Sequence, residues 1–147
     1  MSGAAGGVTA FNVDFLLNKS RPRRFNIAQF ANGVLGGLVS ITASCAYVNP
    51  SEAIYIGAIG GILSGSTIIL LEKLKIDDVV SAIPVHLVGG IWGTLSVAIF
   101  GDFEMMGLEK SRVEQLIIQI IGTFSICLLY TSPSPRDYAA SRMPSSA

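Results

Sequence analysis

Residues 75–93 read KIDDVVSAIPVHLVGGIWG, and the apolar part of this stretch decides the fold. Between residues 79 and 101 there is no Asp, Glu, Lys or Arg, and His86 is the only ionisable side chain. Two more uncharged stretches precede it, at residues 25–51 and 53–71. A hydrocarbon core of about 30 Å is crossed by roughly 20 apolar residues of helix. Three such stretches in succession therefore predict a polytopic membrane protein.

The composition excludes several other classes of protein. Charged residues make up only 14% of the 147 residues, whereas about 25% is usual in a soluble domain. The formal net charge is zero and no basic cluster carries interleaved aromatic residues, so we expect no nucleic acid partner. The two cysteines, Cys45 and Cys127, form neither a disulfide framework nor a metal-binding motif. We therefore expect no metal site.

We predict an all-α fold, a polytopic transmembrane helix bundle with about five membrane segments. The segments run roughly over residues 3–17, 27–48, 53–71 and 79–100, and a fifth begins near Val113. The first segment is short, so it is either a marginal span or a helix that lacks its beginning. A secretory signal peptide is the competing interpretation, but its basic residues would precede the apolar stretch, and here they follow it.

Basic residues predict the orientation of the segments. Residues 19–24 hold one Lys and three Arg in a short loop, which the positive-inside rule places in the cytoplasm. The loop at residues 49–52 has no basic residue and is expected outside. Lys73 and Lys75 then lie inside again, and residues 102–112 lie outside. The predicted sides alternate without conflict.

His86 is the candidate functional residue. At 1.5 Å per residue it lies about 10 Å into its span, and an ionisable group at that depth usually faces the bundle interior and marks a functional site. A helical wheel places it among small residues, which makes Ala82 and Gly90 candidate lining residues. The alternative is a neutral imidazole satisfied by a neighbouring hydroxyl or carbonyl. A haem would need a second axial ligand, and the chain has no other histidine.

The rest of the His86 span also supports predictions. The wheel groups Gly89, Gly93 and Val97 with His86, and we expect this small face to meet protein and the opposite, aliphatic face to meet lipid. Glycine pairs spaced by four residues, Gly33 with Gly37, Gly57 with Gly61 and Gly89 with Gly93, predict close approach between helices.

Residues around His86 have simpler expected roles. Pro84 should either kink the helix or mark where regular helix begins, because it lacks a backbone donor. Asp77 and Asp78 lie just before the span, where a helix N-terminus favours negative charge, so we expect them to cap it. Trp92 points away from the His86 face, which favours an interfacial or packing role.

Three segments resemble parts of the ammonium transporter family. The stretch at residues 75–93 resembles the signature around the family's tenth helix. The stretch NGVLGGLVSITASCAYVNP at residues 32–50 resembles the eighth helix, and IGAIGGILSG at residues 56–65 is similar to the ninth. The resemblance covers about residues 5–126, with the segments in the right order and at the right separations.

The resemblance implies a homotrimer of eleven-helix protomers in the lipid bilayer, each with its own narrow pore. His86 matches the second of the family's paired pore histidines. The family picture is deprotonation of ammonium near the outer mouth, passage of ammonia, and relay of the proton through the histidines. It implies ammonium or ammonia as substrate, a multi-pass protein of the plasma membrane, no cofactor, and a transporter rather than an enzyme. A fragment of about helices seven to eleven is not expected to conduct alone.

Two positions depart from the family pattern. Leu87 stands directly after the pore histidine where many relatives have Gly, and Ala43 stands in the eighth-helix run where many have Pro. Each change could alter local packing and the bore of the pore. A bulkier residue after the histidine resembles members from single-celled algae and other eukaryotic microbes.

The C-terminal residues suggest a different origin. After Ile126 the chain reads CLLYTSPSPRDYAASRMPSSA, which resembles a translated sequencing-library adapter. We therefore predict a partial transporter membrane domain over residues 1–126 and a non-native tail over residues 127–147. The alternative is a native disordered cytoplasmic tail.

Two other functions remain open from the sequence. A membrane ammonium sensor would use the same pore to bind substrate and would report it through a cytoplasmic domain. A small structural membrane protein would be complete at 147 residues.

Overall fold

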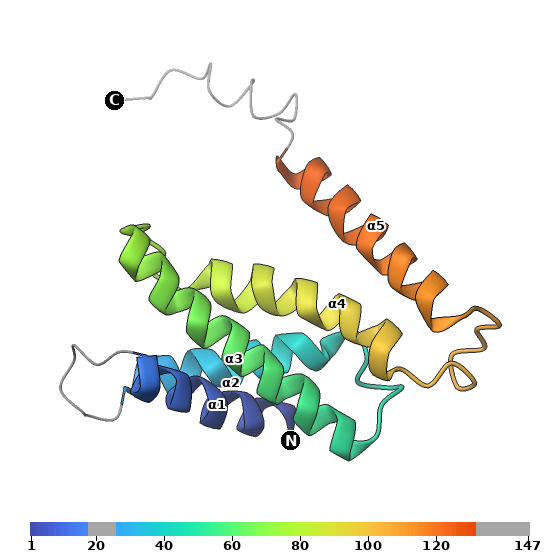
Figure 1. Ribbon diagram of the computed structural model, residues 1–147, viewed down its shortest axis with the longest axis horizontal. Helices are drawn as coiled ribbons and strands as arrows, with labels where there is room; N and C mark the ends of the chain where they lie inside the picture. The colour runs from blue at the N-terminus through green and yellow to red at the C-terminus, as the bar shows by residue number, and fades with distance from the viewer. Residues whose placement is uncertain (18–25, 132–147) are drawn as a thin grey trace, which may run out of the picture.

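The computed structural model describes residues 1–17 and 26–131, and these residues fold into a bundle of helices (Figure 1). The elements are α1 (Ser2–Leu17), α2 (Ile27–Thr42), α3 (Pro50–Leu74), a π-helix η1 (Ile83–Val88), α4 (Gly89–Phe100) and α5 (Arg112–Thr131). The prediction of an all-α fold is confirmed. The basic loop at residues 19–24 and the predicted tail from residue 132 onward lie outside the described residues, while residues 127–131 continue α5.

Within residues 1–17 and 26–131, three helical stretches are long and apolar enough to cross a membrane, namely Pro50–Leu74, Ile83–Phe100 and Arg112–Leu129. Helix α2 is apolar but shorter, and it ends at Thr42 instead of reaching the predicted residue 48. The chain turns over residues 43–47, and the carbonyl of Tyr47 accepts a hydrogen bond of 2.8 Å from the Asp102 amide. Just after α2, the Ser44 amide donates to the Ile41 carbonyl three residues earlier, at 3.1 Å, so the helix ends in a tight turn.

Local capping explains where α3 begins and ends. Pro50 occupies the first turn, where its missing N–H leaves no bond unmade. The Glu52 carboxylate accepts a 2.7 Å hydrogen bond from the Asn49 amide, which closes a capping box. At the other end Lys75 adopts a left-handed conformation with φ 56°, which stops the helix.

Helices α1, α2 and α3 pack against one another through glycines. A Cβ on Gly6 would collide with the carbonyl oxygen of Gly33, and one on Gly61 would collide with the carbonyl oxygen of Gly6. The predicted glycine pairs are buried in these contacts and in the contact of α4 with α2, so the prediction of close helix approach is confirmed.

Polar groups within the bundle bond mainly to carbonyls. Ser40 is fully buried, and its hydroxyl donates to the Gly36 carbonyl at 2.7 Å. Trp92 donates from its indole nitrogen to the Ile56 carbonyl at 3.0 Å, which joins α4 to α3. The packing role predicted for Trp92 is thereby confirmed. In a bilayer such bonds are required because no water is available to replace them.

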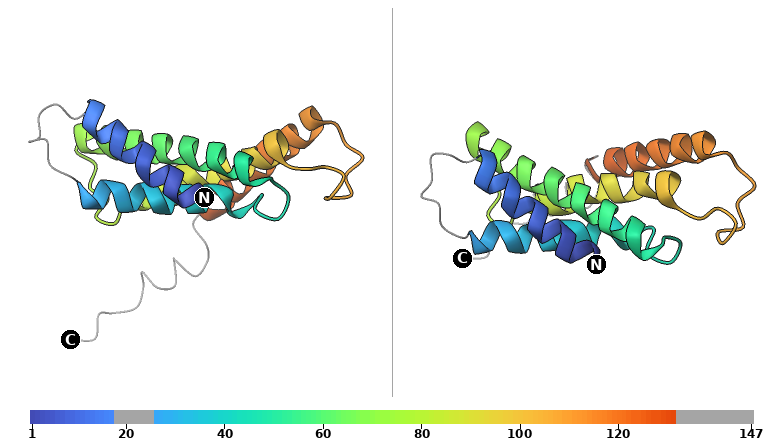
Figure 2. Two further views of the ribbon diagram at one scale, coloured as in Figure 1. Left: turned by 90° about the horizontal axis from the view of Figure 1, so that it is seen from below. Right: turned by 60° about the horizontal axis from the view of Figure 1, so that its bottom comes forward.

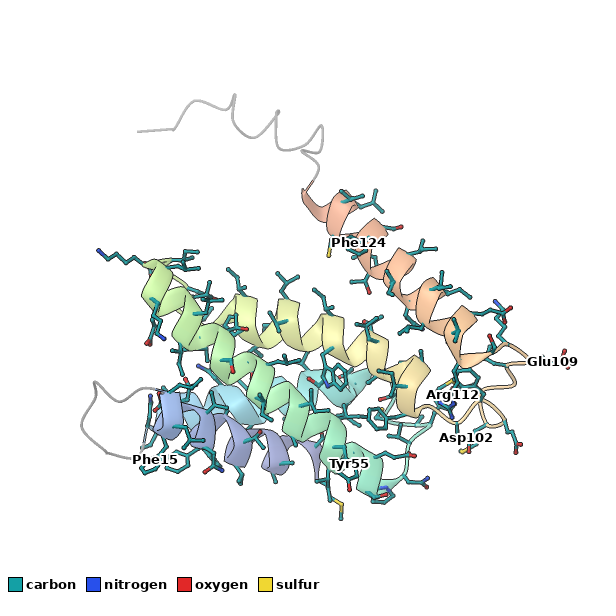
Figure 3. All side chains as sticks on the ribbon, viewed as in Figure 1. Phe15, Tyr55, Asp102, Glu109, Arg112 and Phe124 are labelled. Atoms are coloured by element: carbon teal, nitrogen blue, oxygen red, sulfur yellow. The ribbon has the colours of Figure 1, made fainter. Side chains whose placement is uncertain are left out.

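Helix α5 contacts α4 alone among the described helices and lies beside it in the right view of Figure 2, while Figure 1 shows α5 diverging from the bundle toward its C-terminal end. Figure 3 shows Arg112 and Asp102 at the turn where α4 passes into α5, and Phe124 on the diverging part. The space between α4 and the diverging half of α5 contains an open cleft.

Candidate substrate pathway around His86

The turn before η1 is held by polar side chains. The Asp78 carboxylate accepts hydrogen bonds from the backbone amides of Ala82, at 2.9 Å, and Ile83, at 2.8 Å. Ser81 adopts a left-handed conformation with φ 54°, and its hydroxyl accepts a 3.0 Å hydrogen bond from the Asn32 side chain of α2. The capping role predicted for the two aspartates is confirmed for Asp78.

Pro84 lies in the first turn of η1, so it marks the start of this helical segment. The amide of Gly89 reaches back five residues to the Pro84 carbonyl, the spacing of a π-helix. Pro84 and Val85 are buried against the bundle, whereas His86 is exposed on the other side. The π-turn therefore presents the imidazole away from α2 and α3.

His86 lines a cavity of about 280 Å³ between the η1–α4 segment and α5. Gly90 and Thr94 line the same side as His86, and Gln119, Thr123 and Cys127 line the side formed by α5. The imidazole forms no hydrogen bond with another residue among those the structure describes.

In the structure, the small residues that the helical wheel groups with His86 do not share one environment. Gly89, Gly93 and Val97 are buried, and a Cβ on Gly93 would lie 2.7 Å from the Ser40 carbonyl oxygen. Gly90 lines the cavity with His86, with nothing within 4 Å of an added Cβ. Ala82 is exposed at the start of the helical segment and does not line this cavity. A helical wheel assumes 100° between successive residues. The angle is smaller in a π-helix, so the wheel does not predict this division.

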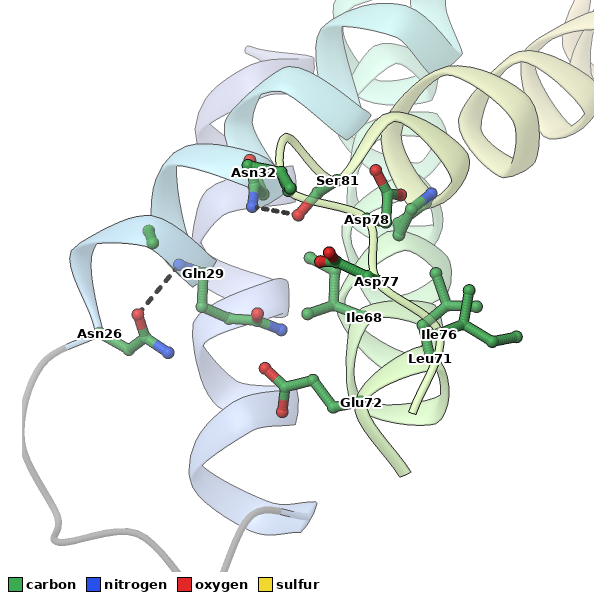
Figure 4. Close-up of a pocket in the computed structure, with 13 residues that line it drawn as sticks. Asn26, Gln29, Asn32, Ile68, Leu71, Glu72, Ile76, Asp77, Asp78 and Ser81 are labelled. Atoms are coloured by element: carbon green, nitrogen blue, oxygen red, sulfur yellow. Dashed lines mark hydrogen bonds between the residues drawn. The ribbon is translucent and has the colours of Figure 1, made fainter. Parts of the chain in front are cut away.

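A second pocket, of about 330 Å³, lies at the end of the bundle where η1 begins (Figure 4). It is lined by amides from Asn26, Gln29 and Asn32 and by carboxylates from Glu72, Asp77 and Asp78, with Pro84 among the lining residues. Gln29 is buried and donates to the Gly65 carbonyl at 3.1 Å. The pocket is polar and adjoins the turn that precedes His86.

Three polar lining residues, Thr94, Gln119 and Thr123, were missed by sequence reasoning. Gln119 and Thr123 lie four residues apart, on one face of an otherwise apolar helix, and this spacing is the signal that would have identified them. In the residues the structure describes, no group of three His, Cys, Asp or Glu side chains could hold a metal ion.

Comparison with known proteins connects this arrangement to a family. The model of the Ammonium Transporter Family matches residues 1–132. Ammonium transporter Amt2 of Archaeoglobus fulgidus is 37% identical over 131 residues, which cover 88% of this chain and 27% of the relative. Ammonium transporter 3 of Dictyostelium discoideum is 42% identical over 101 residues, which cover 68% of this chain and 22% of the relative.

A solved structure supports the fold. The crystal structure of Saccharomyces cerevisiae Mep2 matches with a TM-score of 0.73 at 24% identity, over 84% of this chain and 29% of that one. The chain thus spans between 22% and 29% of the length of these proteins.

The apolar helices and the bundle that they form define a multi-pass helical membrane protein, with a histidine in an open, mainly apolar cleft. The family model matches most of the chain. The chain therefore belongs to the ammonium transporter family. The resemblance stated from the three sequence segments is confirmed.

Proposed function

We propose that the protein transports ammonium across the plasma membrane, as ammonia in the narrow part of a path lined by His86. One observation carries the proposal: the only ionisable side chain of the span at residues 79–101 lines an open cleft between the η1–α4 segment and α5. Its relatives named as ammonium transporters support the choice of substrate.

The chemistry of imidazole suits this substrate. A neutral imidazole has one N–H donor and one acceptor nitrogen, so it can exchange hydrogen bonds with ammonia in place of water. A desolvated ammonium ion is far less favourable in a low-dielectric path than neutral ammonia. Ammonium would therefore release a proton before the narrow part and regain one beyond it, while the imidazole passes a proton between its two nitrogens.

Gly90 and Ala82 are proposed to contribute to the lining. Gly90 adjoins the cavity and adds no side chain to it, so it leaves room for the substrate. Ala82 lies one turn before His86, and Asp78 holds its amide. A small residue at this position would keep the approach to His86 open from the turn side.

We further propose that the protein functions as a homotrimer. Family membership supports this state, and so do the large apolar side chains exposed on α1 and α3, such as Leu17, Tyr55 and Leu70. Such surfaces suit lipid or a neighbouring protomer. The molar mass of the detergent-solubilised protein, measured by light scattering, tests the trimer; a monomer at all concentrations would contradict it.

The function is tested by expressing the complete open reading frame that encodes these residues in yeast lacking its own ammonium transporters. We expect growth on low ammonium with the wild type and loss of growth with His86→Ala. Ile99→Ala, at an exposed position of α4 outside the cavity, is the matched control and should grow as the wild type does. Unchanged uptake, selectivity and current in His86→Ala would refute the proposed role of His86.

A further inference from the structure

The polar pocket at the start of η1 is lined by acidic side chains (Figure 4). Glu72 lies near the end of α3, and Asp77 and Asp78 lie in the turn that follows it. No Lys, Arg or His occurs among the described residues that line the pocket. Lys73 and Lys75 are close in sequence, but both are exposed and neither contributes to the lining. The lining therefore favours a positively charged guest over an anion.

Gln29 of α2 provides a second, independent observation at the same pocket. The residue is only 3% exposed, and Figure 4 shows the end of its side chain directed into the pocket. Its Nε2 group donates to the Gly65 carbonyl at 3.1 Å, and because only the NH₂ group can donate, this bond fixes the orientation of the amide. The Oε1 atom accepts no hydrogen bond from any described residue. An amide oxygen on a nearly buried side chain requires a donor, and a guest in the pocket can supply it.

Several other polar groups of the pocket already bond within the protein. Asn32 donates to the Ser81 hydroxyl, and the Asp78 carboxylate caps the start of the helical segment. Asp77 differs, because its carboxylate forms no hydrogen bond or ion pair with another described residue. The acceptors that remain for a guest therefore include Oε1 of Gln29 and the carboxylate of Asp77.

The arrangement of these oxygens suits an ammonium ion better than a metal ion. In the described part of the chain, no group of three His, Cys, Asp or Glu side chains could hold a metal ion. An ammonium ion needs no such convergence, because its N–H groups can donate to separate acceptors, amide oxygens and water among them. The pocket has a volume of about 330 Å³, which leaves room for the ion and for water molecules that complete its hydrogen bonds.

From these observations we infer that the polar pocket is a binding site for ammonium, with Oε1 of Gln29 and the carboxylate of Asp77 as its acceptors. The inference rests on the proposed function and adds a second site to it. The pocket lies at the end of the bundle that the positive-inside rule places in the cytoplasm. Ammonium in the cytoplasm therefore reaches this site before it reaches His86, and the site sets the affinity for transport out of the cell.

The test compares the two directions of transport. The complete open reading frame is expressed in the same yeast, and initial rates are measured with ammonium chloride in right-side-out and inside-out plasma membrane vesicles. Asp77→Asn removes the charge at nearly the same size. We expect it to raise the KM from the cytoplasmic side about tenfold, the effect of one lost hydrogen bond to a charged group, and to leave the KM from the outer side unchanged. Asp77→Glu keeps the charge and should restore most of the affinity.

Glu109→Gln is the matched control, because Glu109 is an exposed carboxylate in the turn between α4 and α5, at the other end of the bundle (Figure 3). It should leave both KM values unchanged. If the wild type and Glu109→Gln transport ammonium, and Asp77→Asn leaves the KM from the cytoplasmic side unaltered or changes both KM values equally, the inference is overturned while the proposed function stands. If the wild type transports ammonium in neither direction, the proposed function itself fails.

Discussion

The side-chain amide of Asn32 donates a 3.0 Å hydrogen bond to the hydroxyl of Ser81, and so ties α2 to the turn that precedes the histidine helix. Figure 4 shows this bond at the rim of the polar pocket. Ser81 has a φ of 54°, a conformation that few side chains adopt without support. The bond therefore fixes the point at which the chain enters η1, five residues before His86.

Replacing Asn32 should loosen this entry. We expect Asn32→Ala to lower stability by about 1 kcal/mol, the usual net effect of one hydrogen bond, and to reduce uptake by misplacing His86. Ser81→Gly removes the same bond but tolerates positive φ, so it should lose less stability. Thermal unfolding in detergent and ammonium uptake check both. A larger loss of stability in Ser81→Gly than in Asn32→Ala would contradict this account.

The Asp78 cap provides a second prediction, with its neighbour as a control. Asp78→Ala should lower stability by about 1–2 kcal/mol, because the amides of Ala82 and Ile83 would lose their acceptor. Asp78→Asn keeps one acceptor oxygen and should lose less. Asp77 forms no hydrogen bond with another described residue, so Asp77→Ala should leave the unfolding temperature close to that of the wild type. Equal effects at the two aspartates would argue against the cap.

Two glycines of one helix should respond in opposite ways to the same change. Gly93→Ala places a methyl group 2.7 Å from the Ser40 carbonyl oxygen, and backbone cannot move aside easily. Overpacking of this kind usually lowers stability by about 1–3 kcal/mol. Gly90→Ala meets nothing within 4 Å and should be neutral or slightly stabilising, since alanine favours helix. The thermal unfolding temperatures of the two variants, compared with that of the wild type, test this prediction. A Gly90→Ala variant less stable than the wild type would refute the packing described for α4.

A larger side chain at Gly90 tests whether the substrate passes the cavity. Gly90→Leu should leave the bundle folded but fill part of the space beside His86, so ammonium uptake should fall while the amount of protein in the membrane stays normal. Ile99→Leu, at an exposed position of α4 outside the cavity, changes volume little and is the control for membrane insertion. Unchanged uptake by Gly90→Leu would show that the substrate does not pass this cavity.

Arg112 should control how α5 joins α4. Its guanidinium donates to the carbonyls of Ala98, at 3.2 Å, and Ile99, at 2.8 Å, and lies 4.9 Å from the centre of the Phe103 ring. Arg112→Ala should lower stability by about 1 kcal/mol, a modest value because the group is largely exposed. Amide hydrogen exchange should rise at the start of α5. Lysine lacks the planar fork, so Arg112→Lys should rescue only in part.

Much of the fold is predictable from residues alone, because the relevant forces are local. The absence of charge over residues 53–71 and 79–101 predicts two of the membrane helices, and Asn49 with Glu52 explains the start of α3. The glycine pairs predict close helix contacts because only a missing side chain permits them. The family resemblance likewise depends on three segments and their order along the chain. These features require no knowledge of which residues meet across the bundle.

The sequence by itself thus determined the membrane class, the family, and His86 as the residue to examine. Only the tertiary structure decided where His86 points and what faces it. The π-turn separates the histidine from the buried glycines, the Asp102 amide donates to the Tyr47 carbonyl in the turn after α2, and the placement of α5 brings Gln119 and Thr123 to the cavity. Each of these depends on contacts between residues far apart in the chain or on a helix whose period differs from the regular one. A pattern read along one segment cannot contain that information.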